Sequence, residues 1–287
     1  MAELVEIFEV GPRDGLQNEK RQIPASEKIA LVDLLSETGF RRIEVASFVS
    51  AKWVPQMADS DKVLAGIRRQ PGVSYAALTP NIRGYDAAKL ARADEVAIFA
   101  SASEGFSRAN INCSIAESLE RFKPVAMAAT ADGIRVRGYI SCVTDCPFEG
   151  PTPPKMAAEV AAKLRDLGCY EISLGDTIGH ATPASITNML KAVLDVMPAT
   201  RLAGHYHDTM GRALANIEAS LAMGLRVFDA AVGGLGGCPY APGASGNVAT
   251  EAVDALLTSL GYQTGLDGEK LLKAAEMAQQ MRRDTDV

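Results

Sequence analysis

The sequence has no hydrophobic run long enough to cross a membrane. Its longest apolar stretches have the length of a β-strand, whereas a membrane helix needs ~20 apolar residues. The formal net charge is −6, and the basic residues are scattered without the aromatic-interleaved stripe that is typical of nucleic-acid binding. We therefore expect neither a membrane nor a nucleic acid as a main partner, and the composition favours a soluble enzyme.

Cysteine is scarce and odd in number, with five in 287 residues. The residues from Met1 to Glu6 lead almost directly into a predicted strand, which leaves no room for a signal or transit peptide. Unpaired cysteines without a secretion signal are typical of free thiols in a reducing compartment, so we expect a cytoplasmic protein. Cys142 and Cys146 lack a second pair at zinc-finger spacing, and we interpret them as structural.

No stretch resembles a linker, so 287 residues with 47% hydrophobic content predict one domain spanning residues 1–287. Short apolar strands alternate with amphipathic helices along the chain. The predicted strands are Val5–Val10, Ile43–Ala46, Ser74–Leu78, Glu95–Ala100, Arg135–Ser141, Glu171–Leu174, Leu202–His205 and Val227–Val232. Eight strand–helix units over ~250 residues are typical of a (β/α)8 TIM barrel.

The helix signals agree with this alternation. Thr182 and Pro183 mark a helix start, and other helices are expected after Ser26, near Gly211 and over Val248–Leu260. After about Asp267 the sequence predicts a further amphipathic helix, which makes a C-terminal helical extension. An open doubly wound sheet is the alternative, but Gly11–Gly15 after the first strand is not the G-x-G-x-x-G turn such a sheet usually carries.

A repeated connection between a predicted helix and the next predicted strand supports the barrel. Gly39-Phe40, Gly168-Cys169 and Gly224-Leu225 each stand directly before a predicted strand. A glycine can close a helix in the left-handed conformation, so each pair is typical of the short turn that leads into a parallel strand.

Polar residues gather where the predicted strands end. They are Arg13, Asp14 and Gln17 after the first strand, Glu44 and Ser47 on the second, Asp176 after the sixth, and His205 and His207 at the seventh. In a barrel of parallel strands these ends meet at one mouth.

His205 and His207 are two of only three histidines in the chain. Alternate residues of a strand point to the same side, so this pair can hold one metal ion, although an ordinary polar strand end would have the same spacing. Glu44 lies inside an apolar strand and needs a cationic partner, for which Arg13 is the candidate. Such a pair is either catalytic or a salt bridge inside the barrel.

The segment from Gly233 to Asn247 follows the last predicted strand and is rich in glycine. Its length and composition indicate a mobile loop over the barrel mouth, with Cys238 at its tip and Asn247 near its end. A phosphate-binding loop before a helix is the competing interpretation.

These motifs together resemble the 3-hydroxy-3-methylglutaryl-CoA lyases, from about Val5 to Leu272. The motifs are Val10-Gly11-Pro12-Arg13-Asp14-Gly15-Leu16-Gln17, Ile43-Glu44-Val45-Ala46-Ser47-Phe48, Ser173-Leu174-Gly175-Asp176-Thr177-Ile178-Gly179, His205-Tyr206-His207-Asp208 and Gly234-Leu235-Gly236-Gly237-Cys238-Pro239-Tyr240-Ala241. The Arg-Asp-Gly and His-x-His elements are shared with a wider superfamily that includes isopropylmalate and homocitrate synthases. The Gly-Gly-Cys-Pro-Tyr-Ala loop is typical of the lyases.

The resemblance implies a TIM barrel that cleaves 3-hydroxy-3-methylglutaryl-CoA to acetyl-CoA and acetoacetate, a reaction of leucine degradation and ketone-body formation. It implies a divalent cation, Mg2+ or Mn2+, held by Asp14, His205, His207 and Asn247. It also implies a homodimer. The site residues that it implies have separate roles: Arg13 stabilises the enolate, Asp14 or His205 is the base, Cys238 protonates the enolate, Glu44 fixes Arg13, and Gln17, Ser47, Ser173 and Asp176 face the acyl-CoA substrate.

Two features depart from the motifs. His180 follows the Asp176 motif without an expected role, and we interpret it as a surface or rim residue. Tyr206 should point away from the metal.

Two alternative activities stay open. One is a Claisen-type synthase that joins an acyl-CoA to a 2-oxo acid, and the other is an inactive relative that binds metal or CoA without turnover. The short chain favours the lyase over the synthase.

Overall fold

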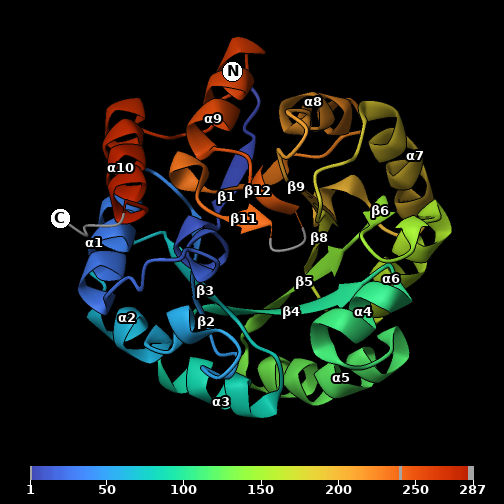
Figure 1. Ribbon diagram of the computed structural model, residues 1–287, viewed down its shortest axis with the longest axis horizontal. Helices are drawn as coiled ribbons and strands as arrows, with labels where there is room; N and C mark the ends of the chain where they lie inside the picture. The colour runs from blue at the N-terminus through green and yellow to red at the C-terminus, as the bar shows by residue number, and fades with distance from the viewer. Residues whose placement is uncertain (1, 239–240, 284–287) are drawn as a thin grey trace.

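The computed structural model describes residues 2–238 and 241–283, and for residues 237, 238 and 241–245 it describes the backbone alone. Eight parallel strands form a closed barrel, in which β1 pairs with both β2 and β10 (Figure 1). The barrel strands are β1 (Glu6–Glu9), β2 (Arg42–Ser47), β3 (Ser74–Leu78), β4 (Glu95–Ser101), β5 (Arg135–Ser141), β8 (Glu171–Asp176), β9 (Leu202–Tyr206) and β10 (Val227–Ala230). The predicted TIM barrel is confirmed, and its closure excludes the open sheet.

A ring of helices surrounds the barrel (Figure 1). They are α1 (Ala25–Ser36), α2 (Ser60–Gly66), α3 (Ile82–Leu90), α4 (Glu104–Ile111), α5 (Ile115–Asp132), α6 (Pro154–Asp166), α7 (Pro183–Leu194), α8 (Ala213–Ala222) and α9 (Thr250–Ser259). The C-terminal extension is α10 (Gly268–Met281), which packs against α1, α9 and the short turn η4 (Val232–Gly234). It therefore covers the seam where the first and last units of the barrel meet.

The helix signals read from the sequence match the observed starts. The Thr182 hydroxyl accepts from the Ser185 amide at 3.2 Å and caps α7, whose first residue is Pro183. The face with Ile186, Leu190 and Val193 is buried. The capping residue therefore predicts where α7 begins, and the apolar spacing predicts which of its faces is buried.

Glycines end the helices where the chain returns to a strand. Gly39, Gly168 and Gly224 have φ of +109°, +97° and +95°, a region that residues with a Cβ rarely adopt. A Cβ on Gly39 would also lie 2.4 Å from the carbonyl oxygen of Gly265. The repeated glycine of the sequence therefore marks a repeated backbone turn.

Two strand ends differ from the sequence prediction by two residues, and the other strand ends agree with it to within one residue. β8 continues to Asp176, because Gly175 and Asp176 pair with His205 and Tyr206 of β9. β10 ends at Ala230, because Ala231 pairs instead with Ala249 in an isolated bridge. Both differences concern the carboxyl end of the barrel, where tertiary pairing overrides the local apolar pattern.

The sequence predicts a mobile loop for the glycine-rich segment after β10, and part of this segment has regular structure. Its described backbone forms a hairpin of β11 (Gly237–Cys238) and β12 (Ala241–Ser245), which lies near the barrel axis in Figure 1. A second hairpin, β6 (Asp145–Cys146) with β7 (Gly150–Pro151), follows β5 and was not expected. Its strands are too short to show an alternating pattern.

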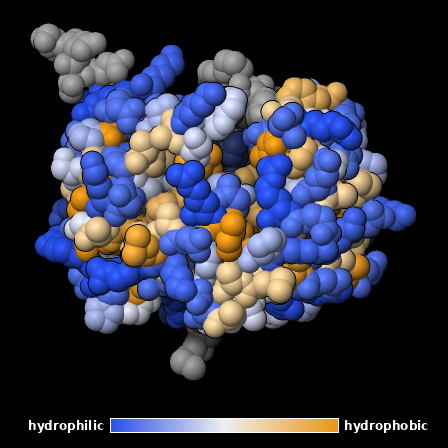
Figure 2. Space-filling model, turned by 90° about the horizontal axis from the view of Figure 1, so that it is seen from below, coloured by the Kyte–Doolittle hydropathy of each residue, from blue (hydrophilic) through white to orange (hydrophobic). Residues whose placement is uncertain are grey.

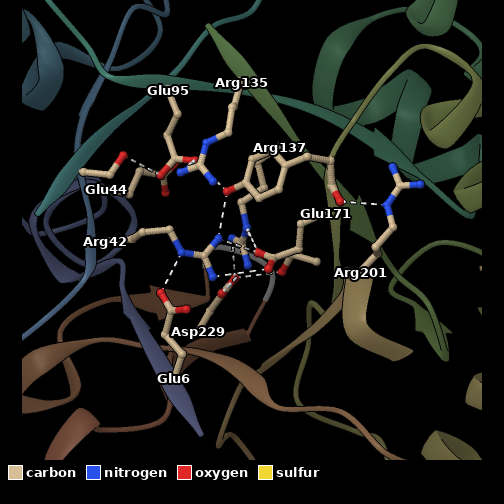
Figure 3. A network of polar contacts seen from close by, with 12 residues as sticks. Glu6, Arg42, Glu44, Glu95, Arg135, Arg137, Glu171, Arg201 and Asp229 are labelled. Atoms are coloured by element: carbon tan, nitrogen blue, oxygen red, sulfur yellow. Dashed lines mark hydrogen bonds and ion pairs between the residues drawn. The ribbon is translucent and has the colours of Figure 1, made fainter. Parts of the chain in front are cut away.

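Charged side chains fill part of the barrel interior (Figure 3). Arg42 and Arg137 both contact Glu171, at 2.9 and 2.7 Å, and Arg42 also contacts Glu6 at 2.6 Å. Arg137 continues to Asp229 at 2.7 Å. Each charge in this network has an opposite partner, which is the condition for placing charges in a protein interior.

The flank that carries α2, α3 and α5 shows hydrophilic and hydrophobic residues interspersed (Figure 2). Within residues 2–238 and 241–283, no helix combines the length and the apolar character that a membrane span requires.

Candidate metal centre and active site

The two histidines predicted as a metal pair lie at the end of β9. His205 is the fourth residue of that strand, and His207 follows its last residue, Tyr206. Both are buried, at 9% exposure, and their ring centroids are 5.4 Å apart. The hydroxyl of Tyr206 contacts Ser220 on α8 at 2.8 Å, so Tyr206 points away from the pair as expected.

Asp14 reaches the histidines from a π-helical turn, η1 (Gly11–Gly15), that directly follows β1. The amides of Arg13 and Asp14 both donate to the Val10 carbonyl, at 3.2 and 2.8 Å, which folds the turn back onto the strand end. Oδ2 of Asp14 then lies 3.8 Å from Nε2 of His205. Burial would raise the pKa of Asp14, but Arg13 and the two histidines outweigh it and lower the pKa to about 2.

Asn247 is held beside this cluster by the backbone. It forms an isolated antiparallel bridge with His207, and its side-chain amide donates to Oδ2 of Asp14 at 2.9 Å. The structure therefore brings together all four predicted metal ligands.

The free nitrogen atoms of the histidines fit a bound cation. Nδ1 of His207 is buried and has no hydrogen-bond partner among the described atoms, which is costly unless a ligand occupies that position. Burial and the neighbouring His205 lower the pKa of His207 to about 4, so the ring is neutral and can act as a ligand.

The cluster has the dimensions of a metal site. Asp14, His205 and His207 each offer one ligand atom, and these atoms all lie within 4.8 Å of one another. Two neutral imidazoles and a carboxylate, with an amide beside them, are donors that Mg2+ and Mn2+ accept. The residues present therefore fit a divalent cation.

Arg13 lies beside the metal cluster and is fixed on two sides. Its guanidinium contacts Glu44 at 2.5 Å and Asp14 at 2.5 Å, and it lies 5.5 Å from the centre of the Tyr139 ring. Burial opposes its charge, but Glu44 and Asp14 raise the pKa of Arg13 above its ordinary value. The predicted Arg13–Glu44 pair is present, and it adjoins the metal cluster rather than standing apart as a structural salt bridge.

Glu44 is fully buried on β2 and receives a second hydrogen bond. The hydroxyl of Tyr139 on β5 donates to Oε2 at 3.1 Å, the same oxygen that faces Arg13. The other oxygen, Oε1, has no partner among the described atoms.

The residues expected to face the substrate lie at several places around the barrel. Ser173 is buried on β8 and donates to Asp229 at 2.7 Å, so it is one contact away from His205. Ser47 is buried at the end of β2, and Gln17 is half-buried just after η1. Ser47 is thus at a strand end, whereas Ser173 lies within β8 and Gln17 follows the turn after β1.

Asp176, another residue expected to face the substrate, bonds its own loop. Its carboxylate accepts from the amides of His180 and Ala181, at 3.2 and 3.0 Å. Burial raises the pKa of Asp176 to about 6. The side chain of His180 is exposed, in agreement with its interpretation as a surface residue.

The thiol predicted to act as the acid, on Cys238, lies outside the described atoms. The backbone of Cys238 belongs to β11 and pairs with Ala241. The other four cysteines are buried and free.

Sequence reasoning missed Asp229, Arg137 and Tyr139. Nδ1 of His205 lies 3.1 Å from Oδ2 of Asp229, and Arg137 forms two hydrogen bonds to the same carboxylate. A signal was available, because Asp229 and Arg137 are charged residues inside predicted strands, as Glu44 is. The argument that a buried charge needs a partner applies equally to them.

Comparisons with known proteins agree with this site. The sequence model of the HMGL-like family matches residues 4–278. The chain is 57% identical over 283 residues to "Hydroxymethylglutaryl-CoA lyase, mitochondrial" of Bos taurus, which covers 98% of this chain and 87% of the relative. It is 58% identical over 272 residues to "3-hydroxy-3-isohexenylglutaryl-CoA/hydroxy-methylglutaryl-CoA lyase" of Pseudomonas aeruginosa, covering 95% of this chain and 91% of that one.

A solved structure of a similarly named protein has nearly the same fold as this chain. The crystal structure titled HMG-CoA lyase from Brucella melitensis superimposes with a TM-score of 0.98 at 60% sequence identity, covering 99% of this chain and 100% of that chain.

Proposed function

Because the chain belongs to the HMGL-like family, we propose that it cleaves 3-hydroxy-3-methylglutaryl-CoA to acetyl-CoA and acetoacetate with the help of a divalent cation. The single observation that carries the proposal is the position of Arg13. It lies against Asp14 of the Asp14–His205–His207 cluster, so one site offers both a cation-binding group and a fixed positive charge.

The reaction sets two electrostatic requirements. A base removes the proton of the tertiary hydroxyl, the bond between that carbon and the CH2 group next to the thioester breaks, and the electron pair moves onto the thioester oxygen. The resulting enolate takes up a proton to give acetyl-CoA, and the former alcohol carbon becomes the ketone of acetoacetate. Negative charge thus develops first at the alkoxide and then at the enolate oxygen, and a positive group at each lowers the barrier.

Asp14, His205, His207 and Asn247 would hold the cation, which supplies Lewis-acid stabilisation at substrate oxygens that gain negative charge. Asn247 would turn its amide oxygen towards the ion in place of the nitrogen that now donates to Asp14. The donor set favours Mg2+ or Mn2+ over tetrahedral zinc.

Arg13 faces the thioester oxygen in this proposal and stabilises the enolate. Glu44 contacts its guanidinium at 2.5 Å, and Tyr139 donates to Glu44 and lies against the guanidinium, so the charge is held in place by the protein itself. A charge that is fixed before the reaction needs no reorganisation when the transition state forms.

Two proton transfers complete the proposal. Asp14 or His205 takes the hydroxyl proton, since both line the cluster. Cys238 gives a proton to the enolate, since a thiol with an ordinary pKa of ~8.5 is mostly protonated at neutral pH. Gln17 and Ser47 face the acyl-CoA substrate and orient it. Ser173 and Asp176 support this surface from beside it, since Ser173 bonds Asp229 and Asp176 bonds the backbone of residues 180 and 181.

The test is a panel of thioesters given to the purified protein with Mg2+ or Mn2+. It contains 3-hydroxy-3-methylglutaryl-CoA, its 3-isohexenyl analogue, which the name of the Pseudomonas aeruginosa relative suggests, and acetyl-CoA with a 2-oxo acid. Acetoacetate and acetyl-CoA should form from the first substrate and not after chelation. Condensation of acetyl-CoA with the 2-oxo acid, without cleavage, would instead identify a synthase.

We also propose that residues 1–287 form one catalytic domain, that the protein is a homodimer, and that it works in the cytoplasm. The four buried free cysteines suit a reducing compartment.

Sedimentation analysis tests the dimer. Fractionation of cells tests the compartment, and it also distinguishes this protein from the bovine relative named mitochondrial.

A further inference from the structure

Asp229 occupies a central place under the metal cluster without belonging to it. It lies on β10 in register with His205 on β9, and its side chain is 0% exposed. Its carboxylate receives two hydrogen bonds from Arg137, at 2.7 and 3.0 Å, and one from Ser173 at 2.7 Å. The fourth contact is with Nδ1 of His205 at 3.1 Å.

These contacts determine which nitrogen atom of His205 carries the proton. Arg137 can only donate, and two N–H groups of its permanently charged guanidinium lie 2.7 and 3.0 Å from the two oxygens of Asp229. The carboxylate is therefore ionised and can only accept, so Nδ1 of His205 must donate to it. The lone pair of His205 is then on Nε2, the atom that faces Asp14.

We propose that Asp229, anchored by Arg137 and Ser173, is the positioning residue that fixes the ring orientation and the tautomer of His205 for metal binding. The proposal rests on the proposed metal site but not on the reaction catalysed there. A carboxylate that orients a ligand histidine in this way typically changes metal affinity 10- to 100-fold.

The alternative is that Asp229 only neutralises Arg137. The chain offers a matched control, because Glu171 contacts the same guanidinium at 2.7 Å and is also buried. Glu171 differs in contacting Arg42 and, among the described contacts, not His205. Glu171→Gln therefore removes a charge from the same network without touching the histidine.

The experiment measures Mn2+ affinity by calorimetry for the wild type, Asp229→Asn and Glu171→Gln, with circular dichroism to check folding. Asp229→Asn should weaken Mn2+ binding on the order of 10- to 100-fold, because its amide can donate to Nδ1 and favour the wrong tautomer. Glu171→Gln should stay within about twofold of the wild type. Equal affinities for Asp229→Asn and wild type, or equal losses in both variants, would overturn the proposal.

A second measurement covers the case in which Asp229→Asn does not fold. Nitrogen-15 NMR of the metal-free wild type, recorded at a pH at which the His205 ring is neutral, should show its single proton on Nδ1, and a neutral ring with its proton on Nε2 would overturn the proposal. Neither measurement depends on turnover. A wild type that binds Mn2+ as expected but cleaves no thioester would contradict the proposed function while the role of Asp229 stands.

Discussion

At the scale of single residues, Arg13 shows how neighbouring charges define a role. Glu44 and Asp14 hold its guanidinium from two directions, at 2.5 Å each, and Tyr139 holds Glu44 in turn. The planar guanidinium of an arginine has several N–H groups, so it can keep these contacts and still donate to a substrate oxygen. The ammonium group of a lysine concentrates its charge on one nitrogen atom and cannot do both. The arrangement suits a charge that acts on the transition state.

Arg13→Gln should lower kcat far more than it raises KM. The enolate oxygen needs a positive partner only as charge develops, so the loss falls on the chemical step. Arg13→Lys should restore little activity. Steady-state kinetics measures both parameters, with Arg165→Gln on α6 as a control outside the site. A change confined to KM would make Arg13 a binding residue.

His207→Ala should abolish tight binding of Mn2+ or Mg2+ and leave the barrel folded. The substitution removes one ligand whose Nδ1 is buried and has no partner among the described atoms, so the fold loses few contacts while the site loses a donor. The exposed His180 provides the control, because His180→Ala removes a histidine away from the cluster. Calorimetric titration after chelation measures the affinity, and an unchanged value in His207→Ala would refute the site.

The sequence was sufficient to predict the His205–His207 pair, the Arg13–Glu44 pair and the turn with Asp14. The spacing of the two histidines follows from strand geometry, and the Arg13–Glu44 pair follows from the need of a buried charge for an opposite partner. The ligand role of Asp14 was implied by the family resemblance. Asp229 and Arg137 were missed because no motif in the sequence indicates which residues are their partners. Their partners are 24 to 92 residues away along the chain, and only the barrel register brings them together.

At the scale of secondary-structure elements, the β11–β12 hairpin is the least predictable part of the site. Glycine-rich composition indicates a loop, yet the described backbone pairs Gly237 with Ser245 and Cys238 with Ala241. Antiparallel pairing across a short connection is set by turn geometry more than by strand propensity. The pairing holds Cys238 on an ordered strand, while the chain re-enters the barrel wall at Asn247.

Cys238→Ala should retain the fold and metal binding and lose on the order of 10²-fold or more in kcat. The loss is what general acid catalysis typically contributes. Cys113→Ala is the matched control, since Cys113 is a free cysteine next to α5. The readouts are kcat, circular dichroism and metal titration. A kcat near that of the wild type would exclude Cys238 as the acid.

At the scale of the whole molecule, the eight-unit barrel was predictable because each unit repeats the same local signals. The apolar strands, the Thr182 cap and the glycine turns at Gly39, Gly168 and Gly224 all agree with one topology. The closure of the barrel was not visible locally. It depends on contacts between distant parts of the chain, among them a carboxylate that joins the first and last units.

That carboxylate is Glu9, at the end of β1. It accepts from the amides of Gly11 and Val232, at 2.7 and 2.9 Å, and from the hydroxyl of Thr250 on α9 at 2.6 Å. It thereby ties η1, which carries Arg13 and Asp14, to the segment after β10. Burial raises the pKa of Glu9 to about 7, despite these hydrogen bonds.

Glu9 therefore makes the stability of the barrel depend on pH. The folded chain keeps a proton on Glu9 that the unfolded chain, with an ordinary pKa near 4.5, has already released. Stability from this group is fully present below pH ~4.5, and it is lost as the pH rises through about 7. Glu9→Gln cannot ionise, and its amide keeps an oxygen for the two backbone donors and a nitrogen that can donate to Thr250.

The variant should consequently gain stability relative to the wild type between pH 5 and pH 8, by about 2–3 kcal/mol at most. Urea unfolding of both proteins at the two pH values measures the difference in midpoint. Asp176, whose pKa is raised to about 6, titrates in both proteins and cancels in the comparison. A difference between the two proteins that does not change with pH would show that Glu9 is ionised in the folded barrel at pH 5, and that the three donors rather than burial set its charge.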